Sequence, residues 1–234
     1  MPKKEEACLI CGKPLIYLKT ADEMTCAICG KSFLSYAKCE EGHFVCDTCH
    51  SEKGVSAVLA YCRQSRSKNP VEIVQSLMAH PSVHMHGPEH HVLVGASLIT
   101  AYYNAGGKVD LESALTEMKE RGGKYPGGSC GFWGCCGAAV SVGMFISIVT
   151  KATPLTDTTW GMANKATSEA LSEIADLGGP RCCKRNSFTA IKAAVNFVKA
   201  NMGISMELPE KTECSYFMKN KQCKHKGCPY YTGV

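Results

Sequence analysis

The spacing of apolar residues changes after about residue 50 and predicts a helical core. From Val55 onward apolar residues recur at helical intervals, and no alternating strand pattern follows residue 50. Asn69 before Pro70 is typical of a helix start, and Gly106 with Gly107 is typical of a stop. The predicted helices cover 55–66, 70–79, 88–104, 110–121, 132–150, 159–177 and 187–201. We therefore expect an all-α core of six or seven helices.

The segment 132–150 is apolar on all sides and rich in small residues, which predicts a central, buried helix. Its longest apolar run, 138–149, is shorter than the roughly 20 residues that span a bilayer. The first residues, MPKKEEACLICGK, contain no apolar export signal. We expect a soluble, cytoplasmic protein that does not associate with a membrane.

Cysteine content changes this picture, because the chain has 16 cysteines in 234 residues. A chain of this length can bury an ordinary core without disulfides, and paired cysteines without an export signal indicate metal ligands or redox centres. The net charge is +5, but metal-bound thiolates would offset it. The basic balance is therefore only weak support for nucleic-acid binding.

The first fifty residues predict a small β module held by metal. Two CxxC knuckles are separated by a spacer that can form a hairpin, which is typical of a zinc ribbon or a treble-clef-like module. A second ligand set follows at once, with His50 in reserve. The predicted ligands are Cys8, Cys11, Cys26, Cys29, Cys39, His43, Cys46 and Cys49.

The pairing of these ligands stays open at this point. The two sets can bind one ion each in consecutive order, or they can interleave as in cross-brace, RING-like modules. We expect two Zn²⁺ ions with a structural role, and a rubredoxin-like iron site is the alternative. Such modules often present a surface to a partner protein or a nucleic acid.

A histidine cluster precedes the predicted helix at 88–104. Five of the eight histidines, with Glu89 among them, fall within twelve residues of the sequence AHPSVHMHGPEHH. A histidine in the first turn of a helix has its protonation disfavoured, which suits a neutral ligand or a base. A polar loop with solvated histidines is the plain alternative. We predict catalytic or proton-shuttle roles for His84, His86 and His90, and cofactor binding by Glu89.

A second candidate site consists of the thiols in the middle of the chain. These cysteines stand beside glycines or at helix entries, although a single free cysteine is more often a small packing residue. Helical geometry does not bring them all onto one face. We predict catalytic or metal-binding thiolates at Cys130, Cys135 and Cys182, with cofactor binding by Cys136 and Cys183.

The tail, TECSYFMKNKQCKHKGCPYYTGV, holds Cys214, Cys223 and Cys228 at C-x8-C-x4-C spacing. This spacing is close to the first three ligands of the CCCH zinc finger that binds single-stranded RNA, and interleaved tyrosines and lysines suit base stacking. The fourth CCCH ligand does not follow Cys228, so His225 is the candidate to complete the site. An iron–sulfur cluster is the other possibility, since Cys-Pro endings are common in cluster ligation.

Two resemblances follow from these motifs. The pattern CGxxxCCGAAxxxG with a later CC is weakly similar to a family of redox-active helical proteins. The whole chain, with its CxxC knuckles, the HxHGPEHH turn and the CGFWGCCG segment, resembles a family of anaerobic archaea and bacteria, domain of unknown function 5714. That resemblance implies an anaerobic, metal-rich setting and brings no established activity with it.

The sequence thus predicts a mainly α metal-binding protein of three segments, 1–52, 53–205 and 206–234. The preferred function is a redox or sulfur- or iron–sulfur-linked enzyme, with an iron–sulfur cluster or additional Zn²⁺ in the core or the tail. The alternatives are a zinc-dependent module that binds protein or RNA, and an accessory factor that delivers a metal or cluster to a methyltransferase or radical enzyme.

Overall fold

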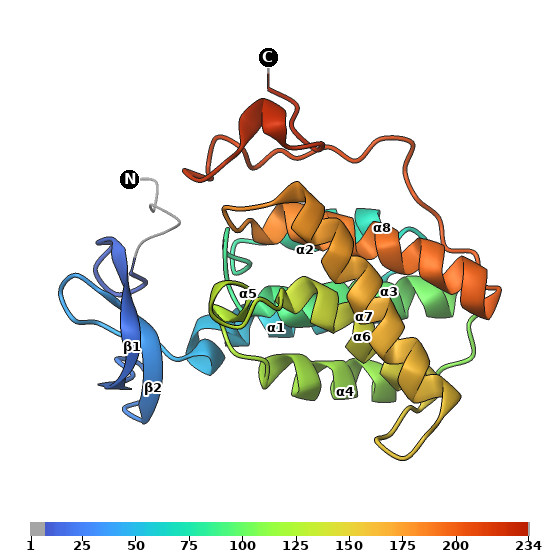
Figure 1. Cartoon of the computed structure of the whole chain (residues 1–234), viewed down its shortest axis with the longest axis horizontal. Coiled ribbons are helices and arrows are strands. Elements are labelled where there is room, and N and C mark those ends of the chain that lie inside the picture. Colours follow the sequence, from blue (N-terminus) through green and yellow to red (C-terminus); the bar gives the residue numbers. More distant parts are fainter. Residues whose placement is uncertain (1–7, 234) are drawn as a thin grey trace.

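The structure, a computed structural model, describes residues 8–233, and within them it contains eight α-helices and one two-stranded sheet. Figure 1 shows a small β module at one end, a helical body, and a tail that crosses above the body. The mainly α fold with a small N-terminal β module is therefore confirmed. The elements are β1 (Leu15–Thr25), β2 (Ser32–Cys39), α1 (Asp47–Gln64), α2 (Pro70–Met78), α3 (Glu89–Asn104), α4 (Leu111–Gly123), α5 (Ser129–Phe132), α6 (Gly137–Thr150), α7 (Thr158–Leu177), α8 (Cys183–Met202) and η1 (His225–Gly227).

The β module is a single antiparallel hairpin with almost no apolar core of its own. Its register runs from Leu15 opposite Cys39 to Thr25 opposite Ser32, with an irregularity between Tyr17 and Asp22. Most side chains of both strands are exposed or half-buried. An isolated two-stranded hairpin is at best marginally stable in water, so this module needs another source of stability.

Helix α3 forms the centre of the helical body. Its side chains are buried without interruption from Val92 to Tyr102, and it packs against α1, α2, α4 and α6. The backbone of α3 approaches α6 closely at Gly95, whose N–H donates to Ser141 Oγ at 2.8 Å. A Cβ at Gly95 would lie 2.1 Å from Met118 Sδ, so only glycine fits there without movement. The unbroken burial of α3 thus reflects its position between several helices, one of which is α6, from the segment that is apolar on all sides.

Helix ends follow the local chemistry at several positions. Asn69 caps α2 by accepting the N–H groups of Val71 and Glu72 at 3.0 and 3.3 Å, and Pro70 is the first residue of the helix. Gly106 after α3 has a φ of +95°, a conformation that side chains rarely adopt. These predicted boundaries are confirmed.

Three predicted helices begin at other residues in the structure. The expected helix over 132–150 starts only at Gly137, as α6, because the backbone bends at residues 133–136, where Gly134 has a φ of +63°, and the short α5 ends before this bend. Helix α1 begins at Asp47, eight positions before the expected start, because it grows directly out of the last cysteine knuckle. Helix α8 begins at Cys183 with Cys182 as its N-cap, so both cysteines belong to the helix start.

The β module rests against the helical body through polar and aromatic contacts. Asp47 Oδ2 accepts the backbone N–H of Gly127 at 2.7 Å. The rings of Tyr36 on β2 and Phe132 on α5 stack with centroids 4.5 Å apart.

No helix in the described part of the chain is long and apolar enough to cross a membrane.

Candidate metal centres and buried polar centre

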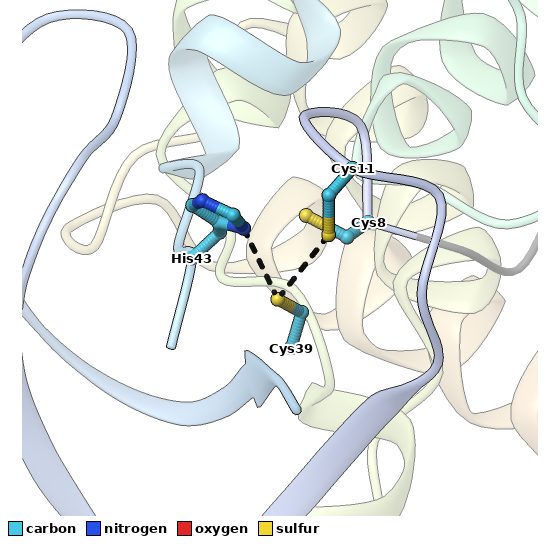
Figure 2. A group of neighbouring side chains, drawn as sticks. All are labelled: Cys8, Cys11, Cys39 and His43. Carbon is cyan, nitrogen blue, oxygen red and sulfur yellow. Dashed lines mark hydrogen bonds between the residues drawn. The ribbon is translucent and has the colours of Figure 1, made fainter. Parts of the chain in front are cut away.

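The eight predicted ligands of the β module form two groups of four. Cys8, Cys11, Cys39 and His43 form one group, and Cys26, Cys29, Cys46 and Cys49 form the other. Within each group the ligand atoms all lie within 4.8 Å of one another. Figure 2 shows the three sulfurs and the imidazole of the first group turned toward a common point.

The two ligand sets interleave, and the hairpin explains why. Pairing of Leu15 with Cys39 brings the end of β2 beside the first knuckle. The chain then turns at Gly42 and forms a parallel bridge between Phe44 and Cys26, which carries it to the second knuckle. The last two cysteines, Cys46 and Cys49, therefore complete the second group. Of the two pairings left open by the sequence, this geometry is the cross-braced one.

The spacing of the sulfurs fits one tetrahedral ion in each group. Cys11 Sγ lies 3.8 Å from Cys39 Sγ, and Cys29 Sγ lies 3.9 Å from Cys46 Sγ. A tetrahedral Zn²⁺ with bonds of about 2.3 Å separates its thiolates by roughly 3.8 Å. Cys39 Sγ also lies 3.4 Å from His43 Nδ1. Each group can thus hold a metal such as zinc.

Backbone N–H groups point at the sulfurs of both groups. Cys8 Sγ accepts the N–H of Ile10, and Cys26 Sγ accepts that of Cys46, both at 3.4 Å. Burial tends to raise the pKa of Cys26, but hydrogen bonds from backbone N–H groups outweigh it and lower the pKa to about 6. A lowered thiol pKa favours the thiolate that a metal binds.

A buried polar centre lies where α1 meets the start of α3. The carboxylate of Glu89 is fully buried, and its Oε1 accepts the backbone N–H of His84 at 2.8 Å. His50, from the first turn of α1, places Nδ1 3.5 Å from Glu89 Oε2. The rings of His50 and His84 are 4.6 Å apart. The structure thus brings His84 and Glu89 together and adds His50, which the sequence offered only as a reserve ligand.

Lys184 connects this centre to α8. Its Nζ donates to the carbonyl oxygen of His84 at 2.8 Å and lies 3.2 Å from His90 Nε2. His90 Nδ1 lies 3.1 Å from the carbonyl oxygen of Gly87, so the N–H of the neutral ring belongs on Nδ1 and Nε2 accepts from Lys184. Both nitrogens of His90 are therefore engaged within the protein, which suits a neutral imidazole that positions Lys184.

The environment of the centre favours an ionised carboxylate on Glu89 and neutral rings on His86 and His90. Burial would raise the pKa of Glu89, but the interaction with the nearby His50, whose Nδ1 lies 3.5 Å from Oε2, outweighs it and lowers the pKa to about 2. Burial, followed by the charge of Lys184, holds the pKa of His90 well below its usual value. Burial, followed by the charge of Arg181, lowers the pKa of His86 to about 3. Such strongly perturbed groups cluster at functional sites more often than elsewhere.

The middle cysteines fall into two places. Cys130 and Cys183 both lie near Cys136, whose Sγ accepts a hydrogen bond from Asn186 Nδ2 at 3.4 Å. Burial raises the pKa of Cys130 and raises that of Cys183 to about 12, so neither is an activated thiol by itself. Cys135 touches Tyr125 through its carbonyl oxygen, which accepts the hydroxyl proton at 2.9 Å.

Cys182 lines a pocket that it shares with the tail. The pocket is lined by Cys182, Cys214, Cys223 and Cys228, together with aromatic and basic side chains. His225 is exposed, and its ring packs against Tyr231 at 5.4 Å. Local sequence gave no signal for this grouping, because the tail runs back along the helical body before it reaches the start of α8.

The tail aromatics take part in the fold. Tyr230 is buried, packs against Phe188 at a centroid distance of 5.4 Å, and its hydroxyl lies 2.9 Å from Thr189 Oγ1. Lys184 Nζ lies 4.9 Å above the ring of Tyr216. Two of the aromatic residues that the sequence suggested for base stacking are thus occupied by contacts with the body.

Comparison with known proteins gives one family. A family model described as "Family of unknown function (DUF5714)" matches residues 58–231. The match takes in most of the helical body and the cysteine-rich tail, and it leaves out the β module. No curated protein and no solved structure matches the chain. The similarity to redox-active helical proteins receives no support from these comparisons.

Proposed function

The chain belongs to the family of unknown function DUF5714, and we propose that it is a zinc-containing metalloenzyme of redox or sulfur chemistry. In this proposal two Zn²⁺ ions fold the β module, and the reaction takes place at the buried polar centre beneath it. The cofactors are the two zinc ions and, in the core or tail, an iron–sulfur cluster or a further Zn²⁺.

One observation carries this proposal: the module and the polar centre share the first turn of α1. Cys49 is a ligand of the second metal group, and the next residue, His50, contacts the buried carboxylate of Glu89. A metal ion on Cys46 and Cys49 therefore fixes the position of His50. Because Cys49 and His50 are adjacent in α1, we infer that metal binding by the β module also positions His50 in the buried polar centre.

Zinc is the metal that suits the two groups best. One group contains an imidazole with three thiolates and the other contains four thiolates, and both are common structural zinc sets. The hairpin has little apolar core, so the binding free energy of the metals would supply much of its folding free energy. The zinc ions would then be structural, and all eight module ligands would be taken up by them.

The polar centre has a cavity beside it that can admit a small anionic substrate. This cavity, about 640 Å³ with its open mouth included, is lined by Lys184 and Lys219 and by the polar side chains of His80 and Ser215. Lys184 also donates to the carbonyl oxygen of His84, so one cation borders both the cavity and the centre. We assign Lys184 to substrate binding, with His90 and Glu89 as groups that hold it in position.

The alternative functions have less support. RNA binding by the tail would use tyrosines, and Tyr230 is instead buried against the body. A partner protein on the β module and delivery of a metal to another enzyme stay predictions that follow from the module type alone.

Zinc counting in paired variants tests the zinc half of the proposal. Wild-type protein should contain two zinc per chain by elemental analysis. Replacing both Cys8 and Cys39 with serine should remove one ion, because both belong to one group, whereas replacing Cys8 and Cys26 should remove two. Consecutive pairing predicts the reverse. If the first variant loses both ions by unfolding, proton–¹¹³Cd correlation on cadmium-loaded wild-type protein gives the pairing directly.

Titration with sulfite tests the substrate half. Backbone amide signals of residues 79–85 and 215–219 should shift on addition of sulfite to the zinc-loaded protein, and Lys219→Gln should weaken the effect about tenfold through loss of one charge at the cavity. Lys165→Gln, on an exposed part of α7, is the matched control. The absence of shifts, or equal shifts in both variants, would remove this cavity from the proposed function.

A further inference from the structure

Four cysteines from two distant parts of the chain meet in one pocket. Cys182 is the N-cap of α8, while Cys214, Cys223 and Cys228 lie in the tail, and all four line the same cavity. The cavity measures about 330 Å³ with its open mouth included. Four free thiols in one pocket of a chain that needs no disulfides can supply the donor set of a metal centre.

The sulfurs of this pocket receive hydrogen bonds in the way that the β-module ligands do. Cys214 Sγ accepts the N–H of Tyr216 at 3.5 Å, and Cys223 Sγ accepts that of His225 at 3.3 Å. The same bond, from the residue two positions on, is made to Cys8 by Ile10 in the first metal group. Such N–H groups stabilise a metal-bound thiolate.

Cys182 is held in the same manner as the tail cysteines, although it belongs to the helical body. Its Sγ accepts the backbone N–H of Arg185 and the side-chain N–H of Asn220, each at 3.5 Å. Asn220 is buried and lies between Cys214 and Cys223 in the sequence. The tail thus supplies three sulfurs and also orients the fourth.

The spacing of the four sulfurs is wider than a single ion requires. In the β module the ligand atoms of each group converge within 4.8 Å, but across residues 8–233 no three of the pocket cysteines do so. A cluster of iron and sulfide places its thiolate ligands on the outside of a larger core, so it needs this wider arrangement. The pocket therefore fits a cluster better than one zinc ion.

The surroundings suit an anionic cluster shielded from water. Met85, Phe217 and the buried Tyr230 contribute apolar walls to the pocket. Arg185 and Lys224 also line it, and the guanidinium of Arg185 is anchored by the carbonyl oxygens of Gly178 and Pro180 at 2.7 and 2.8 Å. Two nearby cations would offset the negative charge that four thiolates bring.

We propose that Cys182, Cys214, Cys223 and Cys228 bind a [4Fe–4S] cluster. This inference rests on the proposal that the protein is a metalloenzyme. The residues that carry it belong neither to the zinc sites nor to the polar centre. Cys182 takes the fourth position that the sequence had offered to His225. Bound in this way, the cluster would connect the tail to the start of α8.

Anaerobic metal analysis of the full-length chain tests the proposal. After reconstitution with ferrous iron and sulfide, wild-type protein should contain about four iron and four sulfide per chain, with a brown absorption band, in addition to two zinc. Cys182→Ser should lose most of this iron or leave a three-iron cluster visible by electron paramagnetic resonance. Zinc alone in a colourless wild-type protein would overturn the proposal, and a zinc count of two would then leave the zinc half of the proposed function intact.

His225→Asn is the matched control because it separates the two candidates for the fourth ligand. The backbone of His225 has a φ of +48°, which asparagine tolerates, so the N–H that bonds to Cys223 keeps its place. This variant should retain the full iron content. Loss of iron in His225→Asn together with full retention in Cys182→Ser would overturn the assignment. If Cys182→Ser does not fold, X-ray absorption at the iron edge of wild-type protein decides: we expect only sulfur ligands bound directly to iron, with iron neighbours beyond them, and a nitrogen ligand would overturn the assignment.

Discussion

Replacing Glu89 with glutamine tests whether the buried carboxylate stabilises the fold. The environment lowers the pKa of Glu89 from 4.5 to about 2, despite the opposing effect of burial. At roughly 1.4 kcal/mol for each unit of pKa, the network favours the charged form over a neutral one by about 3 kcal/mol. Glutamine keeps the shape and can still accept the N–H of His84, so the variant isolates the loss of charge.

Urea denaturation of the zinc-loaded protein at about pH 6.5 provides the measurement. With a slope of about 2 kcal/mol per molar urea, a loss of about 3 kcal/mol lowers the midpoint by about 1.5 M. Glu52→Gln, at an exposed position of α1, is the control and should change the free energy of unfolding by less than about 0.5 kcal/mol. A variant as stable as wild type, or more stable, would refute the reasoning. The desolvation penalty of the buried carboxylate would then equal or exceed the stabilisation from its polar interactions.

Three further predictions concern other parts of the helical body. Asn69→Ala should lower the unfolding free energy by about 1 kcal/mol, since the side chain accepts two N–H groups at the start of α2; thermal denaturation is the assay, and Asn69→Asp, which keeps the acceptor, should lose much less. Gly95→Ala should cost about 1–3 kcal/mol in the same assay because its Cβ would lie 2.1 Å from Met118 Sδ, while Gly123→Ala, with no atom within 4 Å, should be harmless. The pKa of His86 is lowered to about 3 by burial and by the charge of Arg181, with Lys184 acting in the same direction and Glu89 and Asn220 opposing. Its unfolded form therefore takes up a proton below about pH 6.5 and its folded form does not, so stability falls by about 2 kcal/mol on lowering the pH to about 5. His86→Gln should reduce this dependence of the unfolding free energy on pH, measured by denaturation at several pH values. An unchanged dependence would contradict the lowered pKa of His86.

The helices were predictable from the sequence because their signals are local. Apolar periodicity and the cap at Asn69 located α2, α3, α4 and α7 within a few residues. The start of α6 at Gly137 instead of residue 132 was not predictable, because glycines in a run of small residues indicate close packing as readily as a bend. The left-handed backbone conformation of Gly134 interrupts the helix, and this conformation cannot be predicted from the sequence alone.

For the metal sites too, the features that depend on local sequence were predictable, and those that depend on long-range contacts were not. The spacing of the cysteines and His43 predicts all eight candidate ligands of the β module, since each knuckle is a local motif, and the structure brings them together in two groups. Their pairing was not predictable, because consecutive and interleaved orders both give one group of four cysteines and one of three cysteines with a histidine. The proximity of Cys182 to the tail depends on a chain path with no local signature.

The interleaved order of the β-module ligands limits how this chain can be shortened. One group takes two of its residues from the knuckle before β1 and the other from the knuckle between β1 and β2, while the remaining members of both groups lie at or after Cys39, the last residue of β2. A break of the chain between residues 29 and 39 therefore separates candidate ligands of the same ion in both groups. A consecutive arrangement would leave one intact mini-domain on either side of such a cut. The β module should accordingly be inherited, expressed and lost as one indivisible piece.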